Sequence, residues 1–190
     1  VIHDLNFEHF PDDLPAGVRN YYQYYYRRIA QIAKRLISVS EFSKADLQKT
    51  YGVATEKIDV VYNGVGARFK PLSKDEIIET RAKFSGSLPY FLFVGSIHQR
   101  KNLPNMMNAF TQFRSSTGTE MKFIIAGAKR WWNEEMQNAY ENSKFKNDII
   151  FIGRVNDDEL PKITGAAFAL LFASRFEGFG IPIVEAMKCG

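Results

Sequence analysis

Four short apolar runs mark the second half of the chain. They cover residues 89–96 (PYFLFVGS), 121–127 (MKFIIAG), 148–153 (DIIFIG) and 168–174 (FALLFAS). Nearly continuous apolar runs of this length are typical of strands buried on both faces of a parallel sheet. We therefore expect four parallel strands in this part of the chain.

Helical patterns fill the intervals between these runs. Residues 103–114 place apolar side chains at spacings of three and four, the period of a helix with one buried face. Residues 131–143 and 156–165 predict two further helices, and a charged helical piece lies within 66–88. Strands that alternate with helices predict an α/β fold, a Rossmann-like parallel sheet flanked by helices. Ligands of such sheets bind beyond the carboxyl ends of the strands.

The first third of the chain is organised differently. A tyrosine-rich helix is expected at 16–35 and a second helix at 43–51, which Gly52 ends. Short strands are expected at 36–40 and 58–62.

We place a domain boundary near residues 66–71. This gives a first segment, 1–66, that is the end of an N-terminal domain with its linker, and a partial second domain, 67–190. The chain begins on Val1 without a Met and stops at Gly190, just past a helical pattern. Both ends are therefore expected to be cuts through a longer protein.

Composition and charge narrow the function only slightly. The net charge is +4, which suits phosphate-bearing ligands but shows no basic stripe of the kind that predicts nucleic-acid binding. The single cysteine, Cys189, excludes an internal disulfide and a cysteine-based metal site, and it suits a cytoplasmic protein. The predicted helix at 16–35 carries tyrosines beside arginines. Its tyrosines can serve in packing against the rest of the protein or in a peripheral contact with a membrane, and the sequence leaves both alternatives open.

Two glutamates bracket a glycine-rich turn after the last apolar run. Glu177-Gly178-Phe179-Gly180 is followed by a helical pattern with Pro182 in its first turn and Glu185 further along. Gly-Phe-Gly leaves backbone N–H groups open to an anion, and a helix start behind such a turn favours phosphate. The carboxylates can accept hydrogen bonds from sugar hydroxyls. The alternative is an ordinary turn with one surface and one helical glutamate.

A second candidate follows the first run of the same predicted sheet. Gly95-Ser96 leads into His98-Gln99-Arg100-Lys101, which places two cations at a strand's carboxyl end. Arginine and lysine there can neutralise a diphosphate. The alternative is a loop with two solvated basic residues.

Together these segments resemble the family 4 (group 1) glycosyltransferases, retaining enzymes of the GT-B fold. Five segments carry the resemblance in order along the chain: VIHDL at the start, SVSEFSKADL, VVYNGV, VGSIHQRKNL and the E-x7-E pair. The VGSIHQRKNL turn is similar to that of mannosyl- and rhamnosyl-transferring members.

The resemblance implies a role for each matching residue. Glu185 would bind the nucleotide ribose and Glu177 the donor sugar. Lys101, together with Arg100, would neutralise the leaving diphosphate. Gly95 would also belong to the donor-binding residues. The remaining implied donor contacts are the backbone N–H groups of Gly178, Phe179 and Gly180, and His3, which would reach the sugar from the acceptor domain.

One residue departs from the family's pattern. Many members carry Gly-Arg after the first strand, where this chain has Gly95-Ser96. Either Arg100 takes over the role of that arginine, or the diphosphate rests mainly on Lys101.

The resemblance predicts transfer of a hexose from a nucleoside-diphosphate sugar to a glycan or lipid-linked acceptor, with retention. No metal or cofactor is expected, and no nucleic-acid partner. We expect this 190-residue piece alone to be inactive. The alternatives are a donor-binding module without turnover, a sugar-nucleotide epimerase, and a glycan phosphorylase, for which no pyridoxal-lysine motif is visible.

Overall fold

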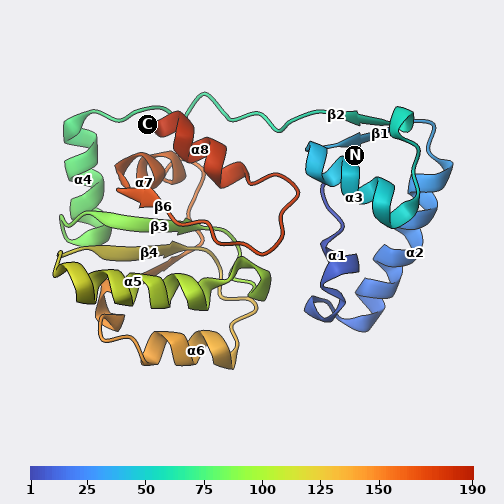
Figure 1. Cartoon of the computed structure of the whole chain (residues 1–190). Helices are drawn as coiled ribbons and strands as arrows, with labels where there is room; N and C mark the ends of the chain where they lie inside the picture. Colours follow the sequence, from blue (N-terminus) through green and yellow to red (C-terminus); the bar gives the residue numbers. More distant parts are fainter. The chain divides into compact units, whose positions relative to one another are not determined.

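The computed structural model describes all 190 residues, which form two compact units (Figure 1). Unit 1 contains residues 1–64 and 176–180, and unit 2 contains residues 65–175 and 181–190. The chain therefore leaves unit 2 at Arg175 and returns to it at Ile181. The predicted domain boundary at residue 66 concerns the longer protein and stays a prediction. The assignment of 176–180 to the first unit was not expected.

Unit 2 is built on a four-stranded parallel sheet in the order β5-β4-β3-β6. Its strands are β3 (Tyr90–Val94), β4 (Lys122–Ala126), β5 (Ile149–Gly153) and β6 (Ala169–Leu170). Its helices are α4 (Lys74–Ser85), α5 (Leu103–Thr117), α6 (Glu134–Glu141), α7 (Leu160–Ala166) and α8 (Ile181–Cys189). The expected α/β fold with a helix-flanked parallel sheet is confirmed.

The pleat of each strand divides its side chains between two cores. Phe93, Phe123 and Ile125 point to a cluster with α5 and α6. Tyr90 and Leu92, from alternate positions, point to a second cluster with α4 and α7. Helices α5 and α6 cover one face of the sheet, and α4, α7 and α8 lie over the other (Figure 1). Burial on both faces explains why the strands read as continuous apolar runs.

Several predicted elements are shorter in the structure. The predicted helix 131–143 begins only at Glu134, because the side chain of Asn133 accepts the Met136 N–H at 2.9 Å and caps it. The predicted helix 156–165 begins at Leu160, because Asn156 Oδ1 accepts the N–H groups of Asp158 and Glu159. The predicted strand 168–174 is reduced to β6, whose ladder with β3 spans two residues.

Unit 1 contains α1 (Asn6–His9), α2 (Ala16–Ile32), β1 (Leu36–Ser38), α3 (Glu41–Tyr51) and β2 (Ile58–Val60). Strands β1 and β2 are parallel, and Ile2 bridges to Ser38 on the other side of β1. The core joins Ile2, Leu5, Phe7, Ala30, Leu36, Leu47, Tyr51, Val53 and Ile58. Helix α2 ends three residues before the predicted end at 35. No helix in the chain is long and apolar enough to cross a membrane.

Candidate functional site

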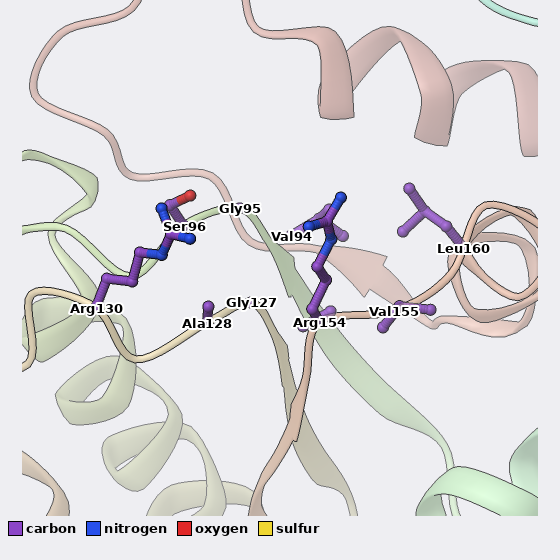
Figure 2. A pocket seen from close by; sticks show the side chains of 10 residues that line it. Val94, Gly95, Ser96, Gly127, Ala128, Arg130, Arg154, Val155 and Leu160 are labelled. Atoms are coloured by element: carbon purple, nitrogen blue, oxygen red, sulfur yellow. The ribbon is translucent and has the colours of Figure 1, made fainter.

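A cavity of about 360 Å³ opens at the carboxyl ends of β3, β4 and β5, in unit 2 (Figure 2). It is lined by Val94, Gly95, Ser96, Ala126, Gly127, Ala128, Arg130, Arg154, Val155 and Leu160. This is the edge of a parallel sheet at which ligands bind. Its walls combine apolar side chains, two glycines and two arginines, a composition suited to a small anionic ligand.

The floor of the cavity depends on two glycines at neighbouring strand ends. Gly95 N–H donates to the Ala126 carbonyl at 3.0 Å, which carries the pairing past the end of β3. Gly95 has φ +148°, a conformation that only glycine adopts easily. A Cβ on Gly127 would lie 1.9 Å from the Gly95 carbonyl oxygen. The close approach of the two strand ends therefore requires glycine at position 127.

The predicted cationic turn lies directly after β3. Residues Gln99–Lys101 form a 3₁₀ turn, and the side chain of His98 accepts the Arg100 N–H at 3.4 Å. The Lys101 side chain extends over Gly95, with its Cε 4.0 Å from the place of a Cβ on that glycine. The structure thus brings Gly95 and Lys101 together at the strand end.

Glu185 lies on α8 and is half-buried. Desolvation by burial raises the pKa of its carboxyl above the ordinary range, and the charge of Arg68 offsets part of that rise. Pro182 stands in the first turn of α8, as the sequence predicted.

The other predicted site residues, His3 and Glu177 to Gly180, lie in unit 1. A Cβ on Gly178 would lie 2.0 Å from the His3 carbonyl oxygen, so the two backbones are in direct contact. The ring of Phe179 lies 6.0 Å from that of Tyr62. The structure brings His3 and Gly178 together, and it places Glu177 and Glu185 in different units.

Serine hydroxyls hold the Gly178 backbone in unit 1. Ser40 Oγ donates to the Gly178 carbonyl and also accepts the Ser43 N–H at 3.0 Å, which caps α3. Ser43 Oγ lies 3.0 Å from the His3 carbonyl oxygen and 3.2 Å from that of Gly178. Ser40 therefore both caps α3 and contacts the Gly178 carbonyl.

Sequence reasoning did not single out Arg130, Arg154 or Gly127. For Arg154 a pattern was available: it directly follows Gly153 at the end of an apolar run, as Ser96 follows Gly95. Arg130 lies three residues beyond Gly127 in an irregular loop, where no periodicity indicates a direction.

Two family models match the chain, and between them they cover most of it. The model "Glycosyl transferases group 1" matches residues 74–190, and the model "Glycosyltransferase Family 4" matches residues 1–68. The structure also has the fold of GT-B glycosyltransferases. Anabaena HepE, solved in complex with UDP and glucose, superposes with a TM-score of 0.74 at 21% identity, over 85% of this chain and 44% of HepE. The chain belongs to the group 1 glycosyltransferases.

Curated relatives agree with this assignment. O-antigen chain mannosyltransferase B of Escherichia coli is 25% identical over 100% of this chain and 50% of its own length. O-antigen chain mannosyltransferase RfbU of Salmonella typhimurium is 28% identical over 98% of this chain and 48% of its own length. The chain thus spans about half the length of the curated relatives it matches.

Proposed function

We propose that the protein transfers a mannosyl group from a nucleoside-diphosphate sugar to a glycan or lipid-linked acceptor, with retention at the anomeric carbon. The observation that carries the proposal is the cavity at the carboxyl ends of β3, β4 and β5, with two arginines and glycine-lined strand ends. Mannose is chosen because two relatives that match almost the whole chain are named O-antigen mannosyltransferases.

In this proposal the site residues have distinct roles. Lys101 and Arg100 neutralise charge that develops on the leaving diphosphate, which stabilises the transition state. Glu185 accepts hydrogen bonds from the ribose. Glu177 and His3 contact the donor sugar, and the backbone of Gly178 to Gly180 supplies N–H donors. No metal or cofactor is included, because the cationic side chains can balance the diphosphate charge alone.

The proposal includes a peripheral contact with an anionic membrane through α2. Exposed apolar side chains share one face of this helix, among them Tyr21, Tyr25, Ile29 and Ile32, at spacings of three or four. Arg28 lies beside them. An apolar stripe with basic neighbours suits a membrane surface. Cytoplasmic localisation likewise stays a prediction.

The test is a transfer assay with the full-length protein and labelled GDP-, UDP-, dTDP- and ADP-sugars, with and without EDTA. We expect transfer from a mannosyl donor that EDTA does not abolish, with the α-anomer of the donor giving an α-linked product. Glu177→Gln should lower kcat by about tenfold or more, since a contact made only in the transition state acts on kcat.

Each other outcome has a definite meaning. Nucleotide binding without transfer to any acceptor would indicate a binding module. Interconversion of two nucleotide sugars would indicate an epimerase. Activity that disappears with EDTA and returns with Mg²⁺ would overturn the metal-independent mechanism.

A further inference from the structure

Arg130 and Arg154 both line the cavity, and neither is paired with an acidic side chain. Across all 190 described residues, neither guanidinium has a carboxylate within ion-pair distance or a side-chain hydrogen bond. Both side chains rise on the open side of the strand ends, and Arg130 is directed toward Ser96 (Figure 2). Two unpaired cations beside one cavity repel each other, so an anion between them would be stabilised.

The loop that carries Arg130 is held on both sides. Lys129 Nζ lies 3.7 Å from the ring centroid of Phe151 and 4.5 Å from that of Trp132. The ring of Trp131 lies 5.0 Å from that of His98, next to the cationic turn. Cation–π and aromatic contacts of this kind stabilise the conformation of the loop that makes them. With Lys129 and Trp131 both engaged, the residue between them is positioned at the cavity.

The surroundings of Arg130 suit phosphate oxygens. Gly95 and Gly127 have no side chain to block an approach to the strand ends, and Ser96 is short and uncharged. The Lys101 side chain extends over Gly95 from the neighbouring turn. A planar guanidinium can donate two parallel hydrogen bonds to a phosphate, which an ammonium cannot.

We propose that Arg130 binds the diphosphate of the donor from above Ser96, and that Arg154 supplies positive charge from the opposite wall of the same cavity. The inference rests on the proposed function, because it names a ligand contact within that site. Many family members carry an arginine after the first strand, at the position where this chain has Ser96. In this inference Arg130, on the loop between β4 and α6, supplies that positive charge instead.

The test measures dissociation constants of GDP, UDP, their free nucleosides and inorganic pyrophosphate by calorimetry on the full-length protein. Arg130→Ala should raise the dissociation constants of the nucleoside diphosphates and of pyrophosphate by about 10- to 100-fold. This loss is the equivalent of one charge-assisted hydrogen-bond pair. The free nucleosides should bind as before. Arg130→Lys should recover only part of the loss.

Two variants serve as controls. Lys144→Ala removes one positive charge from an exposed position of unit 2 that does not line the cavity, and it should change no affinity. Ser96→Arg introduced together with Arg130→Ala should restore diphosphate binding, since a long cationic side chain from position 96 can reach the place toward which Arg130 is directed.

Unchanged diphosphate affinity in Arg130→Ala, or an equal loss for nucleoside and diphosphate, would overturn the inference. The wild-type protein could bind pyrophosphate through Arg130 and yet bind no nucleoside diphosphate. That result would support the anion site and overturn the proposed function. A protein that binds none of these ligands would refute both.

Discussion

Glu185 shows how one half-buried carboxyl links stability to ligand binding. Burial raises the pKa of this carboxyl, so the folded protein binds its proton more tightly than the unfolded chain does. Between the ordinary pKa and the raised one, the folded state holds more protons, and the free energy of unfolding therefore falls as pH rises through that window. Above that window the ionised Glu185 lowers the stability of the free protein.

We predict that Glu185→Gln raises Tm at pH 7 and weakens nucleotide binding. Glutamine avoids the buried charge, but it accepts hydrogen bonds from hydroxyls less strongly than a carboxylate does. The stability gain should disappear at pH values below the ordinary carboxyl pKa, where both states are protonated. Thermal melts from pH 4 to 8 and calorimetry with GDP measure the two effects.

The matched control for this substitution is Glu79→Gln, on the exposed side of α4. Surface substitutions of this kind change stability by less than about 0.5 kcal/mol at any pH. A lower Tm for Glu185→Gln at pH 7 would show that the carboxylate stabilises the fold and that the burial argument is wrong.

At the scale of elements, the site is created by two strand ends that approach each other more closely than side chains allow. Gly127 faces the Gly95 carbonyl, and the backbone bond from Ile97 N–H to the Ala128 carbonyl, at 3.3 Å, continues the pairing beyond β3 and β4. Because both partners are backbone, neither can rotate away from a new methyl group.

Gly127→Ala should therefore lower the free energy of unfolding by about 1–3 kcal/mol, as overpacking does. It should also weaken GDP binding, because the floor of the cavity shifts. Gly66→Ala is the control in the same unit, since its Cβ would meet only the Arg68 side chain, at 3.8 Å. Urea unfolding of both variants gives the difference. Equal stability of the two variants would mean that the strand ends can separate without cost.

The elements themselves were largely predictable, because burial on both faces leaves a continuous apolar run in the sequence. Strands β3, β4 and β5 fall inside the predicted runs. Helix starts were less predictable, since Asn133 and Asn156 use their side chains to hold non-helical turns where the residue pattern already continues. The turn of Arg100 and Lys101 follows β3, as predicted, whereas the position of Arg130 depends on packing by Trp131 and Lys129 that no local pattern reveals.

At the scale of the whole molecule, the grouping of residues 176–180 with unit 1 was beyond sequence reasoning. The hydrogen bonds that hold this segment in unit 1 join residues far apart in the sequence. Ser40 and Gly178 are 138 positions apart, and Ser43 and Gly178 are 135 positions apart. Phe176 adds ring contacts with His9, Phe10 and Phe42. The segment 176–180 thus packs in unit 1, while the residues that flank it on both sides belong to unit 2.

We predict that Gly178→Ala destabilises unit 1 selectively. The new Cβ would lie 2.0 Å from the His3 carbonyl oxygen and 3.1 Å from the Asp4 Cβ. The His3 backbone cannot easily yield, because Ile2 N–H is bonded to the Ile37 carbonyl at 2.8 Å. Hydrogen exchange should therefore speed up at the Ile2 and Val61 amides, both of which pair with β1, and stay unchanged at Gly95 in unit 2.

The control for Gly178→Ala is Gly17→Ala, in α2 of the same unit, where a Cβ meets nothing within 4 Å. Replacing a helical glycine by alanine stabilises by up to about 1 kcal/mol, so exchange in unit 1 should be unchanged or slower. If Gly178→Ala instead accelerated exchange at Gly95 and left Ile2 and Val61 protected, residues 176–180 would have to be reassigned to unit 2. The assignment of Gly178 and Glu177 to the same unit as His3 would then also be lost.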